Sequence, residues 1–82
     1  MHEADLKMIA RKVLYQEGQL SVRALLKERR IEEARDHVLK GIDQCFWNWY
    51  ISFSEAAEFY NLLDLPLERI FKFPQRHKGA FF

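Results

Sequence analysis

The chain has 82 residues, a length that suits one small domain with a modest hydrophobic core. Thirteen basic and twelve acidic residues leave a formal net charge of +1, so the positive excess typical of nucleic-acid binders is absent. The single cysteine excludes an internal disulfide, and no apolar run is long enough for a signal peptide or a membrane span, so we expect a cytoplasmic location.

The apolar spacing of the first half of the chain predicts helices. Residues 4–17 form the first predicted helix, with Gly18 as its left-handed stop. A second apolar stripe follows, and residues 27–35 contain no helix breaker. This stretch predicts one long helix over about 21–50, which the continuous run of helix formers favours, or a helical hairpin whose two helices meet near Arg30.

Three residues on or beside this stripe carry further expectations. Gly41 is costly inside a helix, so it predicts close contact with another helix at this point. Cys45 lies within the stripe, where a buried and chemically inert thiol is expected. Trp49 continues the same spacing and is therefore predicted to lie in the core.

The second half of the chain predicts a break followed by shorter helices. Ser52 and Glu55 have the spacing of a capping box, after which a helix runs to about Leu63. A short last helix follows Asp64, and residues 75–82 form a basic and then apolar tail. Apolar spacing predicts a buried face on the first of these helices at Ala56, Phe59, Tyr60 and Leu63. The whole chain, residues 1–82, thus reads as one all-α domain, a small three- to four-helix bundle.

No grouping of residues suited to catalysis or metal binding is found. The histidines, His2, His37 and His77, lie in three different segments, and one cysteine cannot complete a zinc-type set with them. The acidic residues between 28 and 36 alternate with arginines, which predicts a solvated helix face whose charges neutralise one another. We therefore expect no enzymatic activity, no metal and no other cofactor.

Residues 53–60 and 63–70 indicate a helix, a tight turn and a second helix. The Glu-Ala-Ala start and the later Leu-Pro and Ile resemble the helix-turn-helix of excisionase-like DNA-binding proteins, over about a quarter of the chain. The resemblance implies a second helix in the major groove. Roughly three extra residues separate Ala57 from Ile70 and the usual turn glycine is missing, and the extra length would alter the angle between the helices. On this reading, a DNA-binding regulator would use residues of about 54–78, with Glu68, Arg69, Lys72, Arg76 and Lys78 near the DNA.

Aromatic residues are distributed unevenly along the chain. Eleven of the twelve follow Cys45, and Tyr15 is the exception. Trp47 and Tyr50 fall on the polar side of their predicted helix, so either the last helix covers them or they form an exposed patch. The terminal pair Phe81-Phe82 poses the same choice between the core and an apolar hook.

These observations favour a small regulatory protein that binds another protein as an inhibitor, adaptor or anti-factor. The expected contacts are Trp47, Tyr50, Phe81 and Phe82, with Arg76 and Lys78 steering an acidic partner. A homodimer through the aromatic half is an open alternative. Nucleic acid is the less favoured partner because the charges balance, and no membrane is expected.

Overall fold

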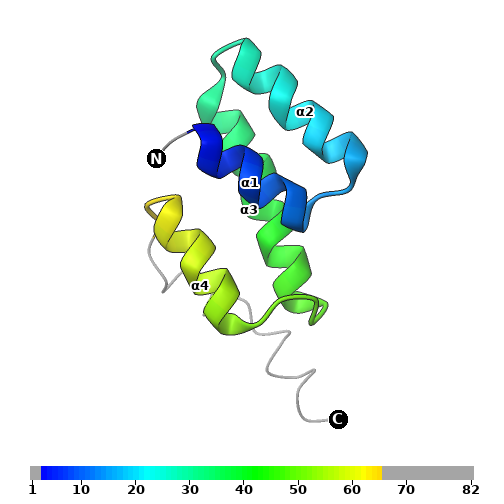
Figure 1. Ribbon diagram of the computed structural model, residues 1–82, viewed down its shortest axis with the longest axis vertical. Helices are drawn as coiled ribbons and strands as arrows, with labels where there is room; N and C mark the ends of the chain where they lie inside the picture. The colour runs from blue at the N-terminus through cyan, green and yellow to red at the C-terminus, as the bar shows by residue number, and fades with distance from the viewer. Residues whose placement is uncertain (1–2, 66–82) are drawn as a thin grey trace.

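The computed structural model describes residues 3–65, and four α-helices follow one another along this part of the chain (Figure 1). Their bounds are α1 Glu3–Val13, α2 Gln16–Lys27, α3 Ile31–Trp47 and α4 Phe53–Leu62. The first three helices each pack against the other two, and α4 packs mainly on α3. In Figure 1, α1 crosses in front of α3 while α2 lies along one side of the pair. The predicted all-α bundle is confirmed.

The core lies where the apolar stripes of the four helices meet. The predicted inner face of α4 is confirmed, because Ala56, Phe59, Tyr60 and Leu63 are all buried. The fully buried Tyr60 also donates a hydrogen bond from its hydroxyl to Asp43 Oδ1 at 2.5 Å, which links α4 to α3. A buried phenol needs such a partner, and the burial of a large apolar side chain contributes roughly 1.5–3 kcal/mol. α4 is therefore held by both apolar packing and a polar link.

The boundary between the first two helices differs from the prediction. The helix expected over residues 4–17 is wrong, because α1 ends at Val13 and α2 begins at Gln16, so Gly18 lies in the first turn of α2. Gly18 serves packing rather than a left-handed stop. A Cβ atom at this position would lie 3.1 Å from Leu14 Cβ, so the glycine gives the Leu14 side chain room.

The break between α2 and α3 agrees with the second of the two predicted arrangements, the helical hairpin. The helical hairpin that meets near Arg30 is what the structure contains, and the single helix over about 21–50 is wrong. Arg29 takes a left-handed conformation with φ of 60°. The amide of Arg30 then donates to Leu25 O at 2.9 Å and that of Arg29 to Leu26 O at 3.1 Å, a Schellman motif that ends α2 without a glycine.

The close helix contact predicted from Gly41 is confirmed. A Cβ atom at Gly41 would lie 2.6 Å from Leu14 Cδ2 and 2.9 Å from Val13 Cγ2. It would also lie 3.1 Å from the backbone oxygen of Val13, which cannot rotate away. The end of α1 therefore rests directly on the backbone of α3.

The capping box predicted for α4 is confirmed as well. Ser52 Oγ accepts a hydrogen bond from the Glu55 amide at 3.1 Å, and Glu55 Oε1 accepts one from the Ser52 amide at 3.1 Å. Two of the unpaired amides at the start of α4 are thereby satisfied. The short helix predicted after Asp64 and the tail predicted over 75–82 lie outside the described residues.

Candidate functional site

The segment that follows α3 places two aromatic side chains in solvent. Trp49 is left-handed with φ of 67°, its amide donates to Phe46 O at 3.2 Å, and the Tyr50 amide donates to Cys45 O at 2.8 Å. This Schellman motif ends α3 at Trp47, so Trp49 lies two residues beyond the helix and does not continue its apolar face. The prediction that Trp49 lies in the core is therefore wrong, since its side chain is 55% exposed. Tyr50 is exposed to 74%.

The two predicted contact residues of this region, Trp47 and Tyr50, differ in how far their side chains are buried. Tyr50 lies in solvent, whereas Trp47 is half-buried and packs against the core. The Trp47 ring meets Phe46 edge-to-face, with centroids 5.4 Å apart and planes at 72°. Phe46 in turn meets Phe53 at 6.1 Å and 63°, so Trp47 belongs to a packed aromatic row. The other predicted contacts lie outside the described residues: Arg76, Lys78, Phe81 and Phe82 for a protein partner, and Arg69 and Lys72 for DNA.

A groove of about 500 Å³ lies between the end of α1 and the last turns of α3. We call it the tyrosine groove, because Tyr15, exposed to 90%, and Tyr50 both line it. Its lining residues are Lys12, Val13, Leu14, Tyr15, Gln44, Cys45, Asn48 and Tyr50. Tyr15 is the one aromatic residue that the sequence sets apart from the others, and the fold brings it to the same groove as Tyr50.

The tyrosine groove is held in place by contacts between α1 and α3. Gly41 allows α1 to approach, and one turn later Cys45 Sγ donates a hydrogen bond to Val13 O at 3.5 Å. Burial raises the pKa of the Cys45 thiol, so the thiol stays protonated near neutral pH. The expectation of an unreactive thiol fits this shift, although Cys45 is only half-buried. On the other rim, Gln19 Nε2 donates to Leu14 O at 3.0 Å and secures the chain just before Tyr15.

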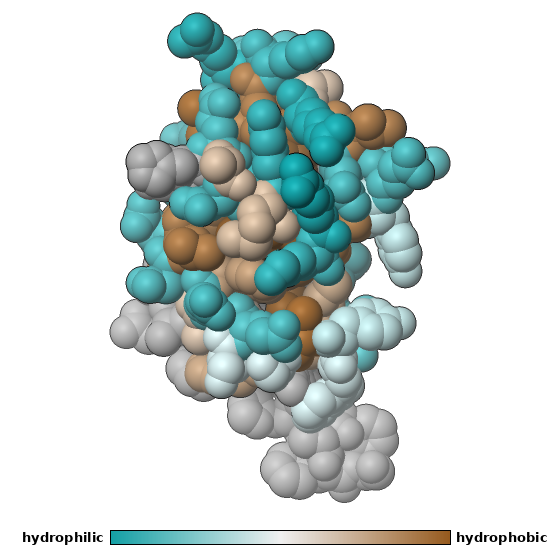
Figure 2. All heavy atoms as spheres, in the orientation of Figure 1, coloured by the Kyte–Doolittle hydropathy of each residue, from teal (hydrophilic) through white to brown (hydrophobic). Residues whose placement is uncertain are grey.

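The surroundings of the groove differ in polarity from the rest of this face. Residues 44–54 contain no charged side chain, in a chain where 30% of residues are charged. Figure 2 shows strongly hydrophilic side chains over α1 and α2 and paler side chains, of intermediate hydropathy, toward the end of α3. On the α3 side, the groove therefore borders an uncharged and aromatic part of the surface, while Lys12 supplies a charge on the α1 side.

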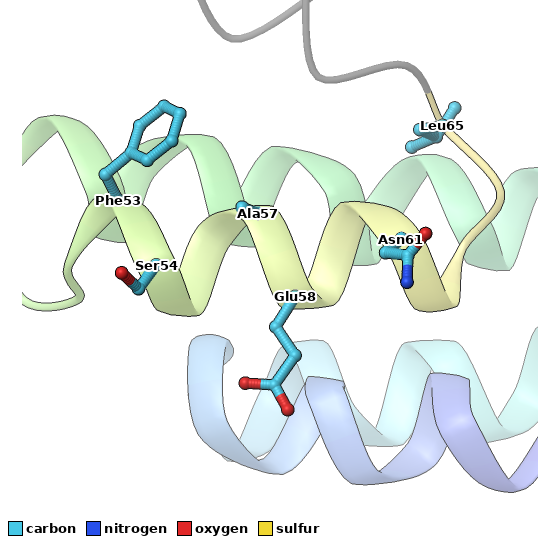
Figure 3. Close-up of a pocket in the computed structure, with 6 residues that line it drawn as sticks. All are labelled: Phe53, Ser54, Ala57, Glu58, Asn61 and Leu65. Carbon is cyan, nitrogen blue, oxygen red and sulfur yellow. The ribbon is translucent and has the colours of Figure 1, made fainter.

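A second hollow, of about 470 Å³, lies along the outer face of α4 (Figure 3). Its lining residues are Phe53, Ser54, Ala57, Glu58, Asn61 and Leu65. In Figure 3 Phe53 projects from one edge of α4 and Glu58 from the opposite edge, and Leu65 lies on the segment that follows the helix. The described lining of this hollow comes from α4 and the segment after it, whereas that of the tyrosine groove comes from two helices and two connecting segments.

No described residues form a group of three or more His, Cys, Asp or Glu side chains able to hold a metal ion. Among residues 3–65, no helix has both the length and the apolar character needed to cross a membrane. Comparisons with protein-family models, with curated proteins and with solved structures found no match to this chain. Support for a function therefore comes from the chemistry of the described surface.

Sequence reasoning named Tyr50 as an expected partner contact, left open whether it is covered or exposed, and missed the part played by Tyr15. The available signal was Gly41, which predicts close helix contact without naming the partner. If α1 is taken as the helix that contacts Gly41, the position of Tyr15 near the end of α3 can be inferred. Val13 and Leu14 form the contact, and Tyr15 is the next residue.

Proposed function

We propose that this chain is a small regulatory protein that binds another protein, as an inhibitor, adaptor or anti-factor, through the tyrosine groove and the aromatic side chains beside it. One observation carries the proposal: Tyr15 and Tyr50 come from separate segments, stand in solvent, and line one groove. Tyrosine is enriched among the residues that dominate binding energy at protein interfaces, because it adds large contact area with a polar tip. Trp47, Arg76, Lys78, Phe81 and Phe82 remain proposed contacts.

The composition of the groove favours binding over catalysis. Among residues 3–65, its lining contains phenols, amides, one ammonium and a thiol, with no carboxylate and no imidazole. A nucleophilic cysteine needs a lowered pKa, and the pKa of Cys45 is raised. What the groove offers a ligand is therefore apolar contact and hydrogen bonding.

DNA binding through residues of about 54–78 is the less favoured function. α4, the first helix of the predicted helix-turn-helix, carries Glu55 and Glu58 and no lysine or arginine. Two carboxylates repel a phosphate backbone. A gel shift with random duplex across salt concentrations tests this alternative, and binding that falls steeply with salt would favour it.

The proposed function is tested by affinity capture from the native host with a matched set of variants. The Tyr15→Ala/Tyr50→Ala double variant should retain at least about tenfold less of the captured partner, since each interface tyrosine contributes about 1–2 kcal/mol. Leu20→Ala is the matched control, because Leu20 is 55% exposed on α2 and does not line the groove. Circular dichroism should find all variants equally helical. Retention that the double variant leaves unchanged contradicts the proposal.

A further inference from the structure

The backbone acceptors on the floor of the tyrosine groove are already engaged by the fold. Val13 O accepts from the Cys45 thiol at 3.5 Å, and Leu14 O accepts from the Gln19 amide at 3.0 Å. A carbonyl that already holds a hydrogen bond has less acceptor capacity for an incoming N–H group. The floor therefore favours apolar contact over the recognition of ligand donors.

The side chains around the groove include donors that no acceptor in residues 3–65 occupies. The Lys12 ammonium lies 5.8 Å from the centroid of the Phe59 ring and makes no ion pair with the described residues. The amides of Gln44 and Asn48 make no side-chain hydrogen bond within that range. Lys12 is also the one charged residue of the described part of the lining, and Arg11 precedes it in the last turn of α1. The groove is thus locally positive in a chain that is nearly neutral overall.

The size of the groove limits what can enter. Its volume of about 500 Å³ lies within the range of roughly 300–1,000 Å³ usual for sites that take small ligands. Such a volume admits one or two side chains. Apolar groups of Val13 and Leu14, with the Cys45 sulfur, form the contact surface for them.

We propose, on the basis of the function proposed above, that the tyrosine groove takes a short acidic segment of a partner protein. In that segment an aliphatic or aromatic side chain enters between Tyr15 and Tyr50. A neighbouring aspartate or glutamate pairs with Lys12. The Gln44 and Asn48 amides donate to the carbonyls of the segment. The choice rests on charge complementarity, because the lining residues that the structure describes include a cation and no carboxylate.

The test is selection from a displayed library of short random peptides against the full chain and matched variants. The unaltered chain should enrich peptides in which Asp or Glu stands beside Leu, Ile or Phe. Lys12→Gln should abolish the acidic preference, and Lys12→Glu should replace it with a basic one. A synthetic acidic peptide should bind Lys12→Glu about tenfold more weakly at low salt. At an alkaline pH at which part of the Cys45 thiol is ionised, the same peptide should slow its alkylation by iodoacetamide, because Cys45 lines the groove.

The outcomes separate this inference from the proposed function. If the enriched peptides lose binding to the Tyr15→Ala/Tyr50→Ala variant but bind the Lys12 variants as well as the unaltered chain, the inference is overturned and the proposed function stands. That result would mean that Lys12 serves the fold, through its contact with the Phe59 ring and the dipole at the end of α1. Peptides indifferent to Tyr15→Ala/Tyr50→Ala overturn both. A tyrosine-dependent dimer in sedimentation, with no peptide enriched, overturns the inference in favour of a second copy of the chain.

Discussion

α2 and α3 end in the same backbone motif with opposite side-chain chemistry. Each places a residue other than glycine in the left-handed region, Arg29 with φ of 60° and Trp49 with φ of 67°. The next residue, Arg30 or Tyr50, donates its amide back into the helix in both cases. Since two arginines form this motif, the motif does not require aromatic side chains. The backbone conformation therefore does not explain why aromatic residues stand at the end of α3.

The surroundings of the two helix ends suggest a reason. At the end of α2, the Arg30 guanidinium donates to Glu33 Oε1 at 2.9 Å and Oε2 at 2.5 Å, and to Glu28 Oε1 at 3.2 Å. The charges there satisfy one another. At the end of α3, Trp49 and Tyr50 stand mostly in solvent beside a groove. The end of α2 thus carries charges that pair with one another, and the end of α3 carries the exposed aromatic side chains of the proposed binding surface.

The largest effect on stability is expected where α1 supports this surface. Gly41→Ala gains up to about 1 kcal/mol of helix propensity but forces a Cβ against Val13 O and two side chains, so we expect a net loss of about 1–3 kcal/mol. Urea unfolding measures it. Gly18→Ala is the matched control, since its tightest contact is 3.1 Å to one side chain, and it should change stability by less than about 1 kcal/mol. Equal stability of Gly41→Ala and the unaltered chain would contradict the tight crossing.

The two turns also differ in how the next helix begins. α3 begins after Arg30 without a side-chain capping bond, whereas α4 begins with the Ser52 and Glu55 capping box. Ser52→Ala should therefore cost about 1 kcal/mol of unfolding free energy, measured by urea titration. Glu55→Gln retains a group that can complete the box and should cost less. A loss with Glu55→Gln as large as that with Ser52→Ala would show that charge, rather than capping, stabilises this turn.

Signals local to the sequence predicted what local chemistry decides. The capping box at Ser52 and the buried face of α4 follow from spacing alone, and the need for close contact at Gly41 follows from the cost of glycine in a helix. These features depend on residues within one or two helical turns. The sequence therefore predicted them without knowledge of the packing.

Helix ends without glycine could not be predicted in this way. Arg29 and Trp49 take a conformation that glycine adopts far more readily, so the helical spacing was extended through both positions. That extension produced the single long helix and placed Trp49 in the core. The pairing of Tyr15 with Tyr50 depends on α1 crossing α3, a tertiary contact between residues far apart in the chain. Spacing along one helix carries no information about such a contact.

Replacing each left-handed residue with glycine compares the two helix ends directly. Arg29→Gly should stabilise the chain by roughly 0.5–1 kcal/mol, because relief of about 1–2 kcal/mol exceeds the added entropy of the unfolded chain. Trp49→Gly receives the same backbone relief and loses the ring, so the difference between the two variants measures what the ring contributes to the fold. Partner retention should fall with Trp49→Gly and stay constant with Arg29→Gly. Equal retention by both would remove Trp49 from the binding surface.

The smallest effect is expected at the ion pairs that close the end of α2. Glu33→Gln removes one carboxylate beside Arg30, whose pKa is raised by the hydrogen bonds that it donates to Glu33 and Glu28. A raised folded-state pKa gives stability that is present below the unfolded-state pKa and lost only as the pH rises through the folded-state value. Both lie far above neutral pH, so this contribution stays constant between pH 5 and pH 9. Because the groups are exposed and screened, the urea midpoint of Glu33→Gln should match that of the unaltered chain. A urea midpoint that is lower for Glu33→Gln than for the unaltered chain, with a difference that disappears when salt is added, would mean that charge pairing holds the turn. The left-handed conformation of Arg29 would then be a consequence of those ion pairs.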